Sequence, residues 1–150
     1  MKCDKNMSLE ECELAILRYV VDTAGQVQGT KFINDPKIIQ IIKIVEQFLR
    51  NKRRICYGGT AINNILPKKD QFYDKKVELP DYDFFSPDAL KDAKNLADIY
   101  VSKGFEEVEA KAGIHHGTYK VYVNFIPVAD ITQLTPEIYK TLIKKSIKVG

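Results

Sequence analysis

The sequence has no tryptophan and only three cysteines among its 150 residues. Cys3, Cys12 and Cys56 are odd in number and widely spaced, and they form no C-x-x-C pair, so we expect reduced thiols and no zinc site. No apolar run approaches the roughly 18 residues of a membrane-spanning helix, which predicts a protein with no membrane association. The first residues include acids and contain no apolar segment, unlike a secretory signal, so we expect an intracellular protein.

The rest of the composition is that of a globular domain. The chain is 45% hydrophobic and 29% charged, which places it among globular proteins rather than disordered ones. This length is enough to bury a hydrophobic core without disulfides. The net charge of +3 is small and does not by itself indicate a nucleic-acid partner.

Two helical patterns occupy residues 1–52. Ser8 followed by Glu11 is a helix-start signature, and it predicts an amphipathic helix of about four turns. A polar stretch over residues 23–34, which contains Gly25, interrupts the pattern before Asp35 and Pro36 start a second helix. We expect these helices to form an N-terminal region that packs on a sheet, although they could equally form a dimer surface.

Residues 53–150 alternate between short strands and helices. The apolar patterns predict strands at 55–57, 81–85, 105–111, 119–125 and 128–131, and helices at 61–66, 89–100 and from 138 onward. The polar segment 67–80 is predicted to be an exposed loop. The expected class is α+β, an α/β sandwich whose mixed sheet carries helices packed on it.

Three carboxylates are candidates for a metal site. Asp81 and Asp83 are two residues apart on a predicted strand, so their side chains share one face. Asp130 ends another predicted strand. If the two strands are neighbours, the acids meet within about 6 Å and each pair repels by roughly 3 kcal/mol. A bound cation would relieve this repulsion, and oxygen ligands without His or Cys favour Mg²⁺ or Mn²⁺.

A glycine turn precedes these acids. Gly58, Gly59 and Thr60 lie between a predicted strand and a predicted helix, where backbone N–H groups favour a phosphate. A lone Asp-x-Asp is more often an exposed strand end, and a lone glycine pair is more often an ordinary turn. The two together predict a triphosphate site that faces a metal-binding acid pair.

These motifs resemble the nucleotidyltransferase superfamily, whose pattern is Gly-Gly-Ser/Thr, then acid-x-acid, then a later third acid. Over about residues 40–143 the chain is more closely similar to the poly(A) polymerase catalytic subunits of large nucleocytoplasmic DNA viruses, of the mimivirus and African swine fever virus type. The gap between Gly59 and Asp81 is longer than is usual in the superfamily, as it is in the viral enzymes. The motifs that carry the resemblance are the runs 56–62, 80–87 and 128–131.

The resemblance implies a polymerase-beta-like fold and a role for each motif. Asp81 and Asp83 would hold two Mg²⁺ (or Mn²⁺) ions. Asp130 would bind the catalytic one and help to activate the attacking 3′-hydroxyl. Gly58 and Gly59 would let the backbone approach the triphosphate of ATP, and the Thr60 hydroxyl would donate to a phosphate oxygen.

The implied activity is template-independent addition of AMP from ATP to RNA 3′ ends. Family members continue into a second domain, so we expect residues 53–150 to be a catalytic core truncated before it, weak or inactive alone. The implied partners are RNA, a second copy or a viral processing-factor subunit, in the host cytoplasm (viral factory) or the virion. Candidate RNA contacts are Arg53, Arg54, Lys68, Lys69, Lys75, Lys76 and His115, although such charge runs are solvated faces about as often as nucleic-acid surfaces.

Two other functions remain open at this point. The chain could be a minimal nucleotidyltransferase that modifies a protein or a small molecule. It could also be a catalytically silent subunit, an RNA-binding scaffold that keeps the fold. Retention of all three acids argues against the silent subunit.

Overall fold

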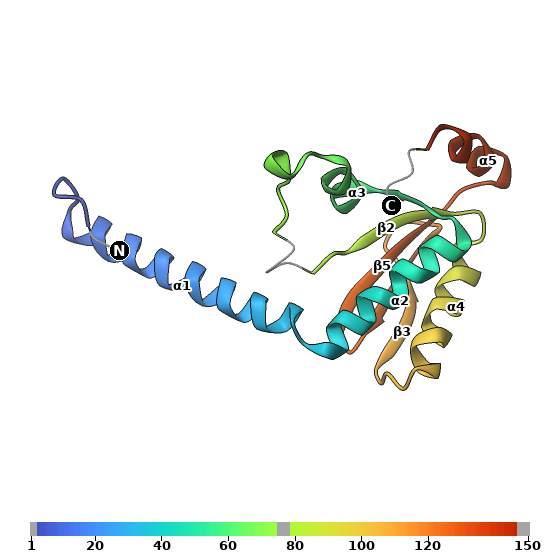
Figure 1. Ribbon diagram of the computed structural model, residues 1–150, viewed down its shortest axis with the longest axis horizontal. Coiled ribbons are helices and arrows are strands. Elements are labelled where there is room, and N and C mark those ends of the chain that lie inside the picture. Colours follow the sequence, from blue (N-terminus) through green and yellow to red (C-terminus); the bar gives the residue numbers. More distant parts are fainter. Residues whose placement is uncertain (1–2, 75–78, 147–150) are drawn as a thin grey trace.

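The computed structural model describes residues 3–74 and 79–146, and its centre is a five-stranded mixed sheet (Figure 1). The strand order is β1-β2-β5-β4-β3, and only β2 and β5 pair in parallel. This arrangement confirms the predicted α+β class. The strands are β1 (Ile55–Tyr57), β2 (Tyr82–Ser86), β3 (Val108–Ala112), β4 (Thr118–Val123) and β5 (Ile126–Gln133).

Two helices cover one face of this sheet. Helix α2 (Pro36–Lys52) begins as predicted, because the Asp35 side chain accepts a hydrogen bond from the Lys37 N–H and Pro36 occupies the first turn. Helix α4 (Ala89–Ser102) begins at its cap, Asp88. The apolar sides of both helices enclose one core with the sheet. Its fully buried members include Val45, Phe84, Leu96, Tyr100, Val121 and Ile131.

Helix α1 (Leu9–Ile33) is longer than the sequence predicts. Its start is the expected capping box, in which Ser8 N–H donates to Glu11 and Glu11 N–H donates to the Ser8 hydroxyl. The predicted break at Thr23 is wrong, because the helix continues to Ile33. The Thr23 hydroxyl donates to the Tyr19 carbonyl, and each of the two glycines in this stretch, Gly25 and Gly29, costs only about 1 kcal/mol.

Figure 1 shows α1 extending away from the sheet, whereas α2 lies on it. Most side chains of α1 are exposed, including Leu9, Leu17 and Val21. The first helix therefore differs from our expectation that both helices pack on the sheet. No helix within the described residues is long and apolar enough to cross a membrane.

The N-terminal cysteines also differ from expectation. Cys3 and Cys12 form a disulfide across a Cα–Cα distance of 5.5 Å, so the prediction of reduced thiols is wrong for this pair. The chain turns between Asp4 and Ser8 before α1 starts, and this turn brings Cys3 beside the first turn of the helix. Cys56 is a free cysteine, as predicted.

The remaining elements frame one edge of the sheet. Helix α3 (Gly58–Ile65) follows β1 directly, and the short 3₁₀ helix η1 (Lys68–Asp70) lies in the predicted exposed loop. Helix α5 (Pro136–Lys145) follows β5. Strand β3 starts at Val108, three residues later than predicted, and Phe125 lies in the tight turn before β5 with a φ of 64°.

Candidate active site

Four side chains form a row across the face of the sheet opposite α2 and α4. Tyr57 pairs with Asp83, Asp83 with Asp130, and Asp130 with Lys120, on β1, β2, β5 and β4 respectively. Directly paired residues share one face of a sheet. The neighbours of this row in sequence, such as Phe84 and Ala129, are buried on the helix side, so the row faces the other way.

The parallel pairing of β2 with β5 therefore brings Asp83 beside Asp130. Asp81 lies two residues before Asp83, and its electrostatic interaction with both acids places it in the same cluster. The sequence predicted this meeting only on the condition that the two strands are neighbours. The observed register meets that condition.

Gly58 closes the site on the β1 side. It has a φ of +76°, and a Cβ atom there would lie 2.6 Å from Oδ2 of Asp83. Any larger residue would therefore collide with the Asp83 carboxylate. Gly58 and Gly59 form the first turn of α3 itself. The Thr60 hydroxyl donates to the Asp81 carbonyl at 2.9 Å, so it ties α3 to the residue that precedes β2.

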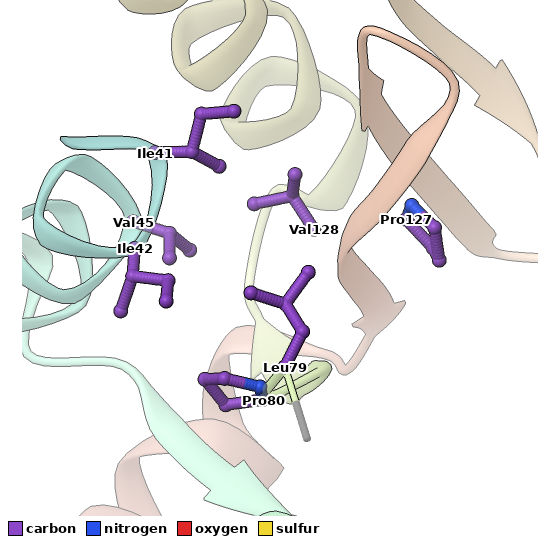
Figure 2. Close-up of a pocket in the computed structure, with 7 residues that line it drawn as sticks. All are labelled: Ile41, Ile42, Val45, Leu79, Pro80, Pro127 and Val128. Atoms are coloured by element: carbon purple, nitrogen blue, oxygen red, sulfur yellow. The ribbon is translucent and has the colours of Figure 1, made fainter. Parts of the chain in front are cut away.

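A seam of apolar side chains between α2 and β5 holds the residues that precede Asp81. Leu79 and Pro80 lie between α2 and β5, next to Val45 and Val128 (Figure 2). Leu79 packs against the main core, and Asp81 follows it by two residues. The seam therefore holds the end of the exposed loop in place beside the acids. The other residues that line it are Ile41, Ile42 and Pro127.

The positions of these carboxylates disfavour their ionised forms. Burial, and then repulsion from Asp81 and Asp130, raises the pKa of Asp83 to about 6. Burial and repulsion from Asp130 also raise the pKa of Asp81. Lys120 opposes both shifts because it supplies nearby positive charge. The cluster therefore carries more negative charge than its protein surroundings compensate.

Lys120 is a site residue that the sequence analysis missed. Its ammonium group donates to Oδ2 of Asp130 at 2.9 Å, whereas Oδ1 of Asp130 is buried and has no hydrogen-bond partner in the described structure. The available signal was a lone lysine in the apolar strand segment Thr118–Val123. Its partner could not be named without the register between β4 and β5.

A hard divalent cation suits this set of groups. The donors are carboxylate oxygens, one buried oxygen of Asp130 lacks a partner within the described residues, and burial and two neighbouring acids raise the pKa of Asp83. Within residues 3–74 and 79–146, no three His, Cys, Asp or Glu side chains are arranged to enclose a metal ion. Asp130 is instead paired with the ammonium group of Lys120.

Tyr73 is a second residue that the sequence did not identify. A Cβ atom on Gly59 would lie 2.6 Å from the Tyr73 hydroxyl, so that hydroxyl lies against the glycine turn. The buried side chain of Asn63 accepts hydrogen bonds from the N–H groups of Phe72 and Tyr73. Asn63 thereby fixes the loop that borders the turn.

The residues expected to contact RNA have different positions. Arg54 donates to both carboxylate oxygens of the buried Asp92 and lies over the ring of Tyr139, a structural use that differs from the expected RNA contact. Arg53 ends α2 in a left-handed conformation and is exposed.

Three further expected RNA contacts lie outside the row formed by Tyr57, Asp83, Asp130 and Lys120. His115 is exposed in the β3–β4 turn, and Lys68 and Lys69 are exposed on η1. Lys75 and Lys76 lie outside the described residues.

Comparison with known proteins agrees with this geometry. The fold matches a solved structure, "Crystal structure of the Megavirus polyadenylate synthase", with a TM-score of 0.75 and 28% identity over 93% of this chain and 29% of that one. A mixed sheet whose first strand enters a glycine-started helix, with acids on neighbouring strands, is the nucleotidyltransferase fold of that relative.

The chain belongs to the family described as the poly(A) polymerase catalytic subunit, whose profile matches residues 43–150. A protein of this name from African swine fever virus (strain Badajoz 1971 Vero-adapted) is 38% identical over 73% of this chain. Another, from Acanthamoeba polyphaga mimivirus, is 37% identical over 61% of it. The chain spans 23% and 16% of the lengths of these relatives.

Proposed function

We propose that the chain carries the catalytic site of a template-independent RNA adenylyltransferase, which adds AMP from ATP to RNA 3′ ends. The observation that carries this proposal is the pairing of Asp83 with Asp130 on adjacent parallel strands, beside the Gly58 turn. Membership of the poly(A) polymerase catalytic subunit family supports the choice of ATP and RNA as substrates.

The reaction is an in-line displacement at the α-phosphorus of ATP. The 3′-oxygen of RNA forms a bond to this phosphorus, the bond to the β-phosphate oxygen breaks, and pyrophosphate leaves. In this proposal Asp130 takes the proton of the 3′-hydroxyl. Lys120 donates to one oxygen of the Asp130 carboxylate and so fixes the orientation of that side chain.

Asp81, Asp83 and Asp130 would together hold the divalent cations, Mg²⁺ or Mn²⁺. When bound, such ions neutralise the developing charge on the attacking and leaving oxygens. The protein's own contribution is positioning: Gly58 leaves space beside Asp83 for a phosphate oxygen, and the first turn of α3 offers backbone N–H groups to it.

The chain corresponds to less than a third of the length of each of these relatives. This difference in length matters for how efficiently residues 1–150 can extend a primer. We propose that residues 53–150 form the catalytic core and that efficient extension also needs the further chain that the longer relatives possess. Robust primer extension by residues 1–150 alone would contradict this part of the proposal. We also propose action in the host cytoplasm or the virion, because the relatives that the chain matches are viral proteins, and a second copy or a processing-factor subunit as partner.

Primer extension tests the activity. The chain is incubated with Mg²⁺, labelled ATP and an oligoadenylate primer, next to the Asp83→Asn variant and the surface variant Asp98→Asn on α4. We expect slow extension by the wild type and Asp98→Asn, and none by Asp83→Asn. Labelled protein with an unextended primer would instead favour a nucleotidyltransferase that modifies proteins.

The silent-scaffold alternative makes a different prediction. If the fold only binds RNA, RNA binding by Asp81→Ala/Asp83→Ala should equal that of the wild type, and neither protein should transfer AMP under any metal condition. The raised pKa of Asp83 argues for catalysis, because an electrostatically unfavourable acid cluster has no use in a scaffold.

A further inference from the structure

A flat aromatic surface lies beside the carboxylates. The ring of Tyr57, from β1, stacks on the ring of Phe85, from β2, with a centroid separation of 4.2 Å and an interplanar angle of 21°. The Tyr57 hydroxyl is 2.7 Å from the hydroxyl oxygen of Thr132, on β5. The ring therefore reaches from β1 across β2 to β5, above the open face of the sheet.

One face of the Tyr57 ring remains available for another partner. Phe85 covers one side of the ring, and it is the only aromatic partner of Tyr57 among the described residues. The helices α2 and α4 pack on the opposite face of the sheet. Tyr57 is only half-buried, as are Phe85 and Thr132.

This aromatic surface and the glycine turn lie on opposite sides of the carboxylates. Gly58 follows Tyr57 beyond the end of β1, and Asp81 precedes β2 at that same end, because the two strands are antiparallel. Phe85 and Thr132 lie two residues beyond Asp83 and Asp130 in the other direction, and they pair with each other. A ligand on Tyr57 is thus separated from the glycine turn by the acids.

In-line displacement assigns the two sides to different substrates. Pyrophosphate leaves opposite to the attacking oxygen, so a triphosphate at the glycine turn places the attacking 3′-hydroxyl on the other side of the carboxylates. We propose that Tyr57 is the stacking surface for the base of the 3′-terminal nucleotide of the acceptor RNA. This inference rests on the proposed function and adds the acceptor subsite to it.

Tyr57 has the properties that such a subsite requires. Base stacking on an aromatic ring tolerates any sequence, which suits an enzyme that must start on unrelated RNA ends. The ring is held by both Phe85 and Thr132 before RNA arrives, so little side-chain freedom is lost on binding.

The β3–β4 turn extends the same side of the site. Thr118 pairs with Thr132, and the Gly117 carbonyl accepts a hydrogen bond from the Gln133 N–H. Ile114 in this turn is 97% exposed. An RNA strand that leaves Tyr57 in this direction would pass the turn and the adjacent His115.

Fluorescence offers a test that is independent of catalysis. Because the chain lacks tryptophan, Tyr57→Trp places a single indole at the proposed subsite, and Tyr19→Trp on the remote helix α1 is the matched control. Each variant is titrated with oligoadenylate RNA, and separately with ATP and Mg²⁺. We expect saturable quenching of Tyr57→Trp by RNA, none by ATP, and no RNA response from Tyr19→Trp.

Other outcomes would overturn the inference. Quenching by ATP alone would place the incoming base on Tyr57, and an identical RNA response from both variants would show that Tyr57 is not a subsite. Quenching by neither ligand would also reject the subsite. Binding of Mn²⁺ and ATP, measured on the same Tyr57→Trp protein, reports on the proposed function separately.

Affinity for RNA provides a second measurement. Tyr57→Phe keeps the ring and should bind oligoadenylate within about twofold of the wild type, whereas Tyr57→Leu should bind on the order of tenfold more weakly. Both variants should keep the wild-type affinity for Mn²⁺ in the presence of ATP. Equal RNA affinities for Tyr57→Leu and the wild type would contradict the inference.

Discussion

At the scale of single residues, Asp83 lies in the candidate site, and its ionised form lowers the stability of the fold. Its pKa is raised from 3.8 to about 6, first by burial and then by the neighbouring acids. The folded state therefore holds this proton to higher pH than the unfolded state does. The free energy of unfolding should fall as pH rises from about 4 to about 6.5 in the absence of metal.

Asp83→Asn should remove this pH dependence. In EDTA at pH 7 we expect the variant to be more stable than the wild type by about 1 kcal/mol, after discounting the pKa shift for solvent screening, and equally stable at pH 4. Denaturant unfolding at both pH values measures the difference. Lower stability of the variant at pH 7 would show that the acid cluster does not strain the fold.

Gly58 is constrained by conformation and by space. Gly58→Ala should destabilise the chain by about 2 kcal/mol or more, because its φ of +76° is strained for alanine and the new Cβ meets Asp83 at 2.6 Å. Gly104→Ala is the matched control, since Gly104 has a φ of +87° but nothing within 4 Å. Chemical denaturation of both variants separates the two effects.

The collision itself can be tested in a second background. Asp83→Ala removes the carboxylate that the new methyl group would meet. The additional loss of stability from Gly58→Ala should then shrink to that of Gly104→Ala. An unchanged loss in the Asp83→Ala background would mean that backbone strain alone explains the glycine.

At the scale of elements, Arg54 connects the start of β1 with α4 and α5. It pairs with Asp92, whose side chain is 2% exposed, and lies over Tyr139, whose hydroxyl donates to the Arg53 carbonyl. Asp92→Ala should cost about 3 kcal/mol or more, because it leaves a poorly solvated guanidinium without its partner. Thermal and denaturant unfolding measure the loss.

An exposed ion pair provides the comparison for this prediction. Glu109 and Lys111 are 44% and 57% exposed, so Glu109→Ala should change the free energy of unfolding by less than about 0.5 kcal/mol. If Asp92→Ala also changes the free energy of unfolding by less than about 0.5 kcal/mol, the Arg54–Asp92 pair does not stabilise the junction of β1, α4 and α5.

Local signals were sufficient to predict several elements. The glycine turn after β1, the start of α4 at Ala89 and the Asp35-Pro36 start of α2 all depend on residues adjacent in sequence. The role of Lys120 and the stacking of Tyr57 on Phe85 depend on strand register, which a single sequence does not specify. The extension of α1 past Thr23 was missed because polar residues and two glycines, Gly25 and Gly29, do not terminate this helix.

At the scale of the whole molecule, α1 stands apart from the folded core. Its contacts within the described structure are chiefly with α2, and the Cys3–Cys12 disulfide lies at its far end (Figure 1). Removal of residues 1–34 should therefore leave the free energy of unfolding within about 1 kcal/mol of the full chain, since little apolar burial is lost. Denaturant unfolding of residues 35–150 measures this.

A core substitution gives the contrast. Phe48→Ala in α2 removes a side chain that is 3% exposed and contacts the ring of Phe84, and it should cost about 3–5 kcal/mol. Unfolding of residues 35–150 at the same denaturant concentration as Phe48→Ala would show that α1 supports the core after all.

Cation binding by the acid cluster is the central claim, and electron paramagnetic resonance of Mn²⁺ tests it most directly. The wild-type chain is titrated with Mn²⁺ with and without ATP, beside Asp81→Asn/Asp83→Asn and the control Asp98→Asn on the exposed side of α4. We predict ATP-dependent Mn²⁺ binding by the wild type and Asp98→Asn, and its loss in the double variant. Equal Mn²⁺ binding by all three proteins would contradict the assignment of Asp81, Asp83 and Asp130 as the metal-dependent nucleotidyl-transfer site.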